Sequence, residues 1–226
     1  MFAQATNYVK DVNATFIFIT AICVFLLLLI TFLMLYFVYK YNKKRNKKAE
    51  NIHEHTVLEV TWTVIPTILV LFMFWYGWTD YKKFIDVPKD SMVIEVTGRM
   101  WQWSFTYPNG LSLDTLYVPL KRNIRLNLKS LDVNHSFYVP AFRVKKDVLP
   151  GRKNYIWFNA DELGSYDVAC SEYCGLRHSY MYTKVVVMPP AEWEIFIAKK
   201  FAEKNGSSKS DSLKTNPDSS IQRETK

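Results

Sequence analysis

A run of twelve residues late in the chain concentrates side chains that bind metals. From Cys170 to Met181 it reads Cys-Ser-Glu-Tyr-Cys-Gly-Leu-Arg-His-Ser-Tyr-Met, with two thiols, an imidazole and a thioether. Thiolate and thioether sulfur together favour copper, whereas a zinc site prefers four Cys or His donors and has no use for a Met. His135 could complete such a site from a different strand. The pattern therefore predicts a copper site.

Simpler interpretations of the same residues remain open. Cys170 and Cys174 could form a disulfide in an oxidising compartment. Met181 could be an ordinary core residue. His135 alone would be read as an ordinary polar residue, and it is a candidate ligand only because of the cluster. Cys23 reads as a small apolar residue within a hydrophobic run, because free cysteine behaves as a small hydrophobe. His53 and His55 lie far from the cluster in sequence, and we expect them to be solvated.

The cluster is embedded in a region with the pattern of β-strands. Ile124, Leu126 and Leu128 alternate with polar residues, which is the two-residue period of a half-buried strand. Similar runs are 92–96, 101–107, 136–139, 155–158 and 182–187, and turn signals such as Pro108-Asn109-Gly110, Pro150-Gly151 and Gly164 lie between them. Residues 87–204 are therefore predicted to form an all-β domain that ends in a short helix, Ala191 to about Glu203. Residues 205–226, rich in serine, are predicted to be a disordered tail.

Two uncharged runs precede this domain, within residues 1–86. The 28 residues between Asp11 and Lys40 carry no charge, and neither do the 20 residues from Val60 to Thr79. A bilayer core of about 30 Å needs roughly 20 apolar residues in a helix, so we predict two membrane spans at about 14–39 and 60–79, after a short N-terminal lead. The first run is long for a cleaved signal peptide and is read as a retained anchor.

Charge gives the orientation of the hairpin and excludes one class of function. The loop between the spans is rich in basic residues: Lys40, Lys43, Lys44, Arg45, Lys47 and Lys48. Because positive loops stay on the cytoplasmic or matrix side, both termini and the β domain are expected outside. The formal net charge of +8 is thus partly a topology signal, and no dense basic block predicts nucleic-acid binding. With 49% hydrophobic residues the chain is not intrinsically disordered.

The cluster resembles the binuclear copper motif of cytochrome c oxidase subunit II, Cys-Ser-Glu-x-Cys-Gly-x-x-His-Ser-x-Met. The resemblance extends in the same order over residues from about 15 to 204. Its other matching segments are Trp62-Thr63-Val64-Ile65-Pro66, Trp101-Gln102-Trp103, Asp132-Val133-Asn134-His135-Ser136, Val139-Pro140, Lys145 with Asp147, and Pro150-Gly151-Arg152.

This resemblance implies two hairpin membrane helices followed by a cupredoxin-like domain that holds two copper ions. The implied bridging thiolates are Cys170 and Cys174, and the implied terminal ligands are His135, His178, Met181 and the backbone carbonyl of Glu172. Quinol-oxidising relatives keep the fold and lose these ligands, but all six positions are present here. The Glu172 carboxylate is further implied to face a Mg²⁺ shared with subunit I, and such a hard cation prefers oxygen.

Two more residues acquire roles from the resemblance. Trp101 matches the aromatic residue that receives the electron from cytochrome c, although the usual His-Gln before it is Arg99-Met100 here. Glu59 matches the carboxylate at the mouth of a proton path into subunit I. A basic cytochrome c predicts an acidic docking face. Its candidates are Asp114, Asp132, Asp161, Glu162 and Asp167, but residues 87–200 carry 15 basic and 11 acidic side chains.

The function implied is that of the subunit through which electrons enter a respiratory terminal oxidase. It takes electrons from reduced cytochrome c and passes them to subunit I, which contains the haem, reduces O₂ and pumps protons; subunit III is a further expected partner. The chain would not be active alone. The alternatives are the copper subunit of a nitric oxide reductase and a membrane-anchored thiol-redox or copper-delivery protein. The Lys-rich loop and long polar tail favour a bacterial plasma membrane over the mitochondrial inner membrane.

Overall fold

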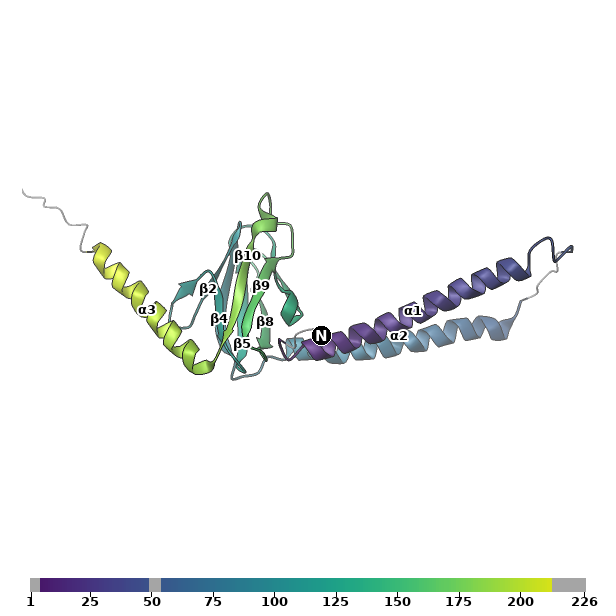
Figure 1. The fold of residues 1–226 in the computed structure, drawn as a ribbon, viewed down its shortest axis with the longest axis horizontal. Helices are drawn as coiled ribbons and strands as arrows, with labels where there is room; N and C mark the ends of the chain where they lie inside the picture. Colours follow the sequence, from purple (N-terminus) through teal and green to yellow (C-terminus); the bar gives the residue numbers. More distant parts are fainter. Residues whose placement is uncertain (1–4, 49–53, 213–226) are drawn as a thin grey trace, which may run out of the picture. The chain divides into compact units, whose positions relative to one another are not determined.

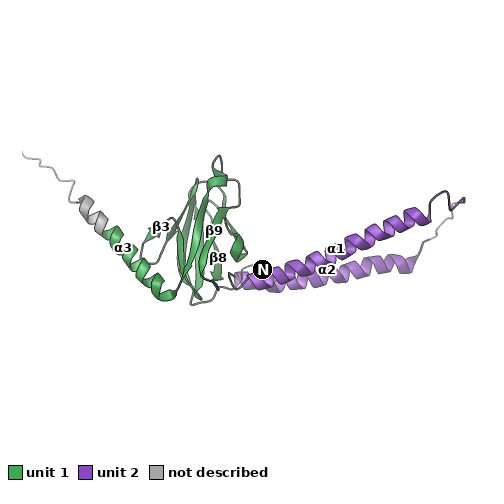
Figure 2. Cartoon of the chain, in the orientation of Figure 1, with its two compact units in different colours: residues 1–7, 87–226 green, residues 8–86 purple. Residues whose placement is uncertain are grey.

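The computed structural model describes residues 5–48 and 54–212, and these form two compact units (Figures 1 and 2). One is a helical hairpin spanning Tyr8–Asp86. The other is a β domain that contains the chain from Val87 onward together with residues 5–7. His53 lies outside the described residues, so its predicted solvation stays a prediction.

The hairpin consists of α1 (Val9–Lys40) and α2 (Thr56–Ile85). Both helices are long and apolar enough to cross a membrane, and their apolar stretches are not buried inside the chain. Each helix contains the predicted span and continues past it into charged residues, because backbone hydrogen bonding in a helix does not depend on apolar side chains. α2 also contains Pro66, and His55 caps its first turn by accepting a hydrogen bond from the Leu58 amide at 3.3 Å.

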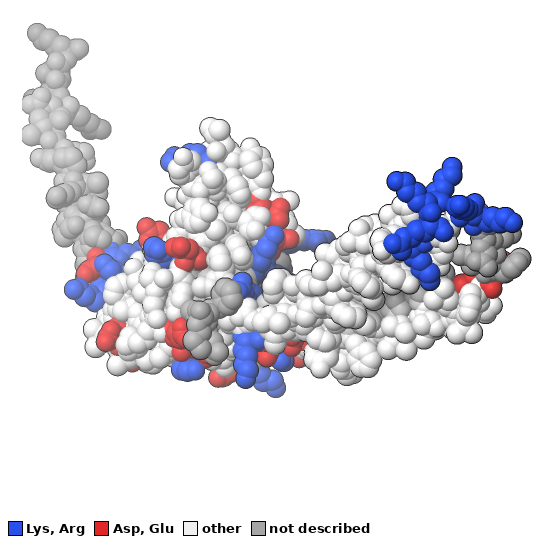
Figure 3. All heavy atoms as spheres, turned by 45° about the vertical axis from the view of Figure 1, so that its right-hand side comes forward, with Lys and Arg blue, Asp and Glu red and all other residues white. Residues whose placement is uncertain are grey.

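Polar and aromatic contacts join the two helices near the ends that adjoin the β domain in sequence. The Thr15 hydroxyl donates to the Asp80 carboxylate at 2.6 Å, Lys83 pairs with Asp11, and the rings of Tyr8 and Phe84 stack at 4.1 Å. At the opposite end of the hairpin, Lys and Arg side chains gather around the loop after α1 (Figure 3). This segregation of charge is what the positive loop in the sequence predicts.

The β domain is a sandwich of two five-stranded sheets. The first sheet has the strand order β3-β2-β1-β5-β8 and the second β4-β10-β9-β6-β7. The strands are β1 (Met92–Arg99), β2 (Gln102–Thr106), β3 (Ser112–Leu113), β4 (Leu116–Pro119), β5 (Asn123–Ser130), β6 (His135–Val139), β7 (Val144–Val148), β8 (Asn154–Asn159), β9 (Gly164–Cys170) and β10 (Tyr182–Met188). Two short 3₁₀ turns, η1 (Pro140–Phe142) and η2 (His178–Tyr180), interrupt the connections.

Alternation of apolar residues fills the space between the sheets, as the sequence predicts. Met92, Ile94 and Val96 of β1 are buried, and the parallel neighbour β5 buries Ile124, Leu126 and Leu128 opposite them. This in-phase burial is the expected result of a period of two on paired strands. The second sheet contributes Phe137, Val168 and Val185, among others, to the same core.

The six predicted strand segments are confirmed, but four strands were not predicted. β3 and β4 are short, β7 carries Lys145, Lys146 and Asp147, and β9 begins at Gly164, which reads as a turn residue in the sequence. Gly164 has φ +149°, a backbone conformation that favours glycine, and it is also the first residue of β9. Pairing with neighbours in the sheet therefore outweighs weak local patterns.

Both chain termini depart from the predicted domain limits. The C-terminal helix α3 runs over Pro190–Ser212, so the first residues of the predicted disordered tail are helical, while 213–226 lie outside the described residues. A low content of apolar residues gives no packing signal in the sequence, but the backbone hydrogen bonds of a helix do not require one. At the other end, Ala5 and Thr6 of the predicted lead are buried in the β domain, where Thr6 donates to the Phe142 carbonyl at 3.0 Å.

Candidate metal centre

The cluster residues come together because β6 begins and its antiparallel neighbour β9 ends at the same end of the second sheet. His135 is the first residue of β6 and Cys170 is the last of antiparallel β9, with Phe137 paired to Cys170. The Ser171 amide then donates to the Ser136 carbonyl at 3.0 Å, and the Cys170 amide donates to the Met181 carbonyl at 3.1 Å. These bonds anchor both ends of the β9–β10 loop, residues 171–181, beside His135.

The six candidate donors divide into two equivalent groups, one around each sulfur. Cys170 Sγ lies 3.9 Å from His135 Nδ1 and 3.2 Å from the Glu172 carbonyl oxygen. Cys174 Sγ lies 3.5 Å from His178 Nδ1 and 3.7 Å from Met181 Sδ. The two sulfurs are 3.7 Å apart, well beyond the roughly 2.05 Å of a disulfide bond, and both thiols are free.

Burial and mutual contact give the two thiols unequal proton affinities. His135 and Met181 are fully buried, and the two cysteines are nearly so. Burial raises the pKa of Cys170, but hydrogen bonds with His135, Ser136, Glu172 and Cys174 outweigh it and lower that pKa to about 6. Burial and the adjacent Cys170 sulfur raise the pKa of Cys174 to about 12. Cys170 therefore loses its proton more easily than Cys174, and a bound cation would favour the thiolate form of both.

Asp132 fixes the orientation of the His135 ring. The imidazole Nε2 lies 2.8 Å from Asp132 Oδ1, so Nδ1 is the nitrogen that faces Cys170. Asp132 Oδ2 accepts a hydrogen bond from the Met100 amide at 2.7 Å. Although desolvation opposes it, the bonds from Met100 and His135 lower the Asp132 pKa. Burial alone lowers the pKa of His135, while Cys170 and Asp132 outweigh it and raise that pKa.

Gly98 and Trp103 enclose His135 from the first sheet. Trp103 meets the imidazole edge-on, with ring centroids 5.9 Å apart, and meets Phe137 at 5.5 Å. A Cβ on Gly98 would lie 3.1 Å from the Trp103 ring and 3.2 Å from His135 Cδ2. Position 98 therefore has no room for a side chain while the imidazole holds its place. Trp103, Phe105 and Tyr107 are buried on one face, as strand alternation predicts.

The Glu172 carboxylate contacts a lysine, whereas the backbone carbonyl of the same residue lies close to Cys170 Sγ. The carboxylate is half-exposed and lies 3.2 Å from Lys145 Nζ, from β7. Its oxygens are therefore accessible on the surface beside the thiol cluster. No second carboxylate joins it in an ion-binding group within residues 5–48 and 54–212, where the group found is His135, Cys170 and Cys174.

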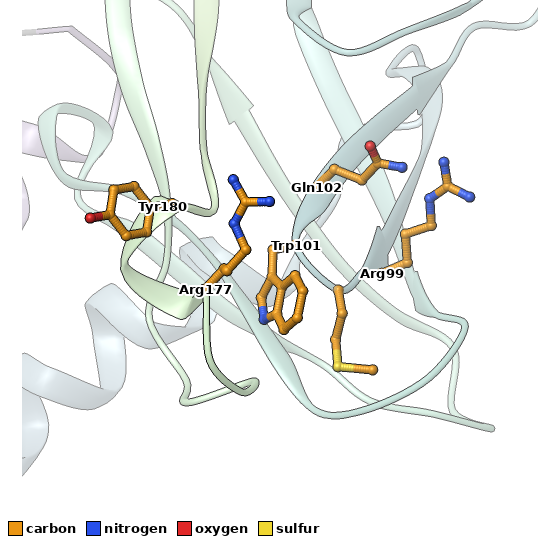
Figure 4. Close-up of a pocket in the computed structure, with 6 residues that line it drawn as sticks. Arg99, Trp101, Gln102, Arg177 and Tyr180 are labelled. Atoms are coloured by element: carbon orange, nitrogen blue, oxygen red, sulfur yellow. The ribbon is translucent and has the colours of Figure 1, made fainter.

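Trp101 stands just before β2 and beside the cluster loop. It lines a surface hollow of about 430 Å³ with Arg99, Met100, Gln102, Arg177 and Tyr180 (Figure 4). A Cβ on Gly175 would lie 3.4 Å from the indole nitrogen, so the ring packs against the backbone one residue after Cys174. Gly175 has φ +111°, which also favours glycine there. Figure 4 shows Arg99 and Arg177 on opposite sides of the ring.

Glu59 is on the hairpin unit, and within residues 5–48 and 54–212 it belongs to no group of metal-binding side chains. It lies exposed in the first turn of α2, where the Thr63 hydroxyl donates to its carbonyl at 2.9 Å. Its role stays a prediction from the resemblance. Cys23 is free and exposed on α1, and Glu54 and His55 are exposed before α2, all within the hairpin unit.

Comparison with known proteins decides the family. The profile of the periplasmic domain of cytochrome c oxidase subunit II matches residues 67–188, and that of its transmembrane domain matches residues 1–78. The chain belongs to the cytochrome c oxidase subunit II family. As a subunit II, it is the part of an oxidoreductase complex through which electrons enter. It is a membrane protein whose β domain corresponds to the periplasmic domain of the family.

Individual relatives agree with this assignment. The alternative cytochrome c oxidase subunit 2 of Bradyrhizobium diazoefficiens is 30% identical over 89% of this chain and 85% of its own. The subunit 2 of Cereibacter sphaeroides is 28% identical over 76% of this chain and 70% of its own. The crystal structure of the periplasmic domain of subunit II of Bradyrhizobium japonicum matches with TM-score 0.50 and 32% identity, covering 52% of this chain and 99% of that one. The cupredoxin-like fold is thereby confirmed, and the alternative functions are not favoured.

Sequence reasoning missed the residues that support the subunit II cluster. Asp132 was predicted as a docking acid, yet its carboxylate is engaged with His135 and Met100. The role of Gly98 was not predicted. A glycine inside an alternating strand indicates that another group approaches the backbone closely, but the sequence does not identify that group. The spacing of Asp132 three residues before His135 was the one available signal for the first of these.

Proposed function

We propose that the six donors hold two copper ions, with the thiolates of Cys170 and Cys174 shared between them. The observation that carries this proposal is the division of the donors into two matched groups. Each sulfur has one imidazole Nδ1 and one further donor nearby, the Glu172 carbonyl or the Met181 thioether. A single tetrahedral ion leaves two of six donors unused, whereas two ions employ them all. When bound, the copper pair supplies a one-electron redox centre.

The protein contributes rigidity and the exclusion of water. His135 and Met181 are fully buried, and hydrogen bonds at both ends of the β9–β10 loop restrain the backbone that carries the remaining donors. Asp132 holds the imidazole of His135 so that Nδ1 stays directed at Cys170. Because these groups are already placed, little rearrangement accompanies the gain or loss of an electron, which favours rapid transfer.

Trp101 is proposed as the residue at which the electron arrives. Its ring is partly exposed in the surface hollow and packs on Gly175, the residue that follows Cys174. This contact supports a short route from the surface to a thiolate. The donor is proposed to be a reduced c-type cytochrome, and the acceptor subunit I, where haem chemistry reduces O₂ and drives proton pumping.

Three further assignments complete the proposal. The exposed Glu172 carboxylate provides an oxygen ligand for Mg²⁺ at the boundary with subunit I, a position in which the ion competes with Lys145. Glu59 provides the carboxylate at the mouth of a proton path. The β domain and both termini lie outside a bacterial plasma membrane, with the basic loop inside.

Trp101→Phe in the assembled oxidase tests the electron route. We expect a loss of cytochrome c oxidation on the order of tenfold or more, with the copper content and copper spectrum unchanged, because Trp101 is not one of the six candidate ligands. Trp193→Phe, which replaces an indole in α3 that packs against Tyr107, is the control and should leave cytochrome c oxidation unchanged. Unchanged oxidation by the Trp101 variant would overturn the assigned route.

Glu59→Gln separates proton uptake from electron transfer. We expect slower turnover and reduced proton uptake with an unchanged rate of copper reduction, since Glu59 lies on the hairpin unit. Glu54→Gln is the comparison, because Glu54 is an exposed acid just before α2 and the competing candidate for this role; we expect it to leave turnover unchanged. If turnover and proton uptake are normal in the Glu59 variant, the assignment is wrong.

A further inference from the structure

The surface around Trp101 carries the opposite charge to the one expected for a partner of a basic cytochrome. We define the Trp101 rim as the five residues that surround the indole in its hollow: Arg99, Met100, Gln102, Arg177 and Tyr180. Two of the five are arginines, and none is acidic. Both arginine side chains are exposed, on opposite sides of the indole (Figure 4).

Neither rim arginine is neutralised by a neighbouring acid. Within residues 5–48 and 54–212, neither Arg99 nor Arg177 takes part in an ion pair. Arg99 instead faces the Gln102 amide. The loop end of the β domain, at the top of Figure 3, shows basic and uncharged atoms but no acidic ones in that view. Two positive charges are therefore available to a docking partner.

Four of the five predicted docking acids are engaged or distant. The fifth, Asp114, is exposed, and its carbonyl accepts a hydrogen bond from Thr183, two residues after the cluster loop, at 2.6 Å. Asp132 is bound to His135 and Met100, while Asp161 pairs with Lys121 at 2.7 Å and Asp167 with Lys184 at 2.8 Å. Asp161 and Glu162 also precede β9, whereas the cluster loop follows it. The seven residues of β9 separate these two acids from the loop by roughly 20 Å at the rise of a strand.

Apolar side chains give this surface the other property of a docking site. Tyr180 is 75% exposed, Leu176 87% and Met100 44%. Leu176 directly follows Gly175, which packs on the Trp101 ring. Exposed apolar residues grouped beside unpaired arginines are typical of protein interfaces, in which aromatic residues, Met and Arg are enriched.

We propose that the electron donor docks on the Trp101 rim through an acidic contact face. Guanidinium groups bind carboxylates in a bidentate manner, so carboxylates around the donor's redox centre would engage Arg99 and Arg177 and place that centre over the indole. Opposite charge also speeds the encounter of the two proteins. This inference rests on the proposed role of Trp101, and it replaces the expectation of an acidic docking face on this chain.

A charge series of one donor tests the proposal on the assembled oxidase. The probes are reduced basic cytochrome c, the same protein with acetylated lysines, and the same protein with succinylated lysines, which are positive, neutral and negative at those positions. At an ionic strength of about 10 mM we expect the succinylated form to be oxidised at least about tenfold faster than the basic form, with the acetylated form between them. This difference should shrink when ionic strength rises to about 0.3 M, because the Debye length falls to several ångströms. Equal rates, or a faster basic form, would overturn the proposal.

Charge reversal locates the effect. The double variant Arg99→Glu/Arg177→Glu should invert the order of the three probes. Lys89→Glu/Arg122→Glu makes the same change in net charge at two exposed basic residues that precede β1 and β5 and should keep the order. An order that survives in the rim variant contradicts docking at the rim.

The two proposals fail in different ways. If Trp101→Phe leaves every probe's rate unchanged while the arginine variant inverts their order, the rim is the docking surface and the electron route is wrong. If Trp101→Phe slows every probe while the arginine variant changes nothing, the route stands and the acidic donor is wrong.

Discussion

The pocket formed by the six candidate metal ligands and the Trp101 rim both include residues of the β9–β10 loop, but they differ in how their polar groups are paired. In the pocket, the ligand side chains have polar partners: Cys170 and Cys174 face His135 and His178, and Asp132 holds His135. At the rim, two exposed arginines have no acidic partner within residues 5–48 and 54–212. Metal ligands need fixed positions, and contacts with neighbouring polar groups provide them. A docking surface instead needs charged side chains that are available to a partner.

The sharpest way to break the pocket is to remove one shared thiolate. We expect Cys174→Ser to abolish binding of the copper pair, because the Ser hydroxyl is a poor ligand for copper and both donor groups lose a common sulfur. Metal analysis and electron paramagnetic resonance of the assembled oxidase measure this. Cys23→Ser, on α1, is the matched control and should retain the signal.

A second change tests whether Asp132 positions His135. Asp132→Asn keeps the shape but removes the charge that orients the imidazole, and such partners of metal ligands typically contribute 10–100-fold to metal affinity. We expect weaker copper retention during titration with a chelator and a shifted copper spectrum. Asp114→Asn provides the control. Unchanged retention and spectrum would show that the hydrogen bond has no part in ligand placement.

Gly98→Ala tests the packing behind the same imidazole. The new Cβ would lie 3.1 Å from Trp103 and 3.2 Å from His135, so one of the two rings must shift. We expect a cost of about 1–3 kcal/mol in stability and an altered copper resonance spectrum. Gly77→Ala is the control, since nothing lies within 4 Å of a Cβ there. A spectrum identical to that of the unmodified protein would show that the pocket tolerates the extra carbon without moving His135.

The smallest expected effect lies away from both regions, at Tyr107. Its hydroxyl donates to the Tyr117 carbonyl at 2.9 Å and accepts from the Tyr117 amide at 2.7 Å, and burial raises its pKa. Tyr107→Phe should therefore cost about 1–2 kcal/mol in the free energy of unfolding near pH 7, without changing copper binding.

The pH dependence of this difference follows from the direction of the shift. The neutral Tyr107 stabilises the fold fully below its unfolded pKa of about 10, and this contribution is lost as the pH rises towards the folded pKa. Denaturant titrations of the β domain should show a difference between unmodified protein and variant that shrinks above about pH 10. A difference that stays constant from pH 8 to 11 would contradict the raised pKa.

The sequence predicted what depends on residue type and period. Apolar length predicted α1 and α2, alternation predicted β1 and β5, and the donor spacing from Cys170 to Met181 predicted a soft-metal cluster. Strands made by pairing alone, such as β7 with its three charged residues, carry no such pattern. The partners of Asp132 and the neighbours of Gly98 depend on residues distant in sequence, so they needed the fold. The charge of the Trp101 rim needed it as well, because composition averages over all faces.

Copper loading of the β domain alone tests the central claim most directly. The corresponding domain of the Bradyrhizobium japonicum relative has been solved by itself, and residues 87–212 here contain all six donors. Metal analysis with electron paramagnetic resonance should find two coppers per chain that share one unpaired electron. One copper, a zinc ion, or a Cys170–Cys174 disulfide in a well-folded domain would contradict a binuclear centre.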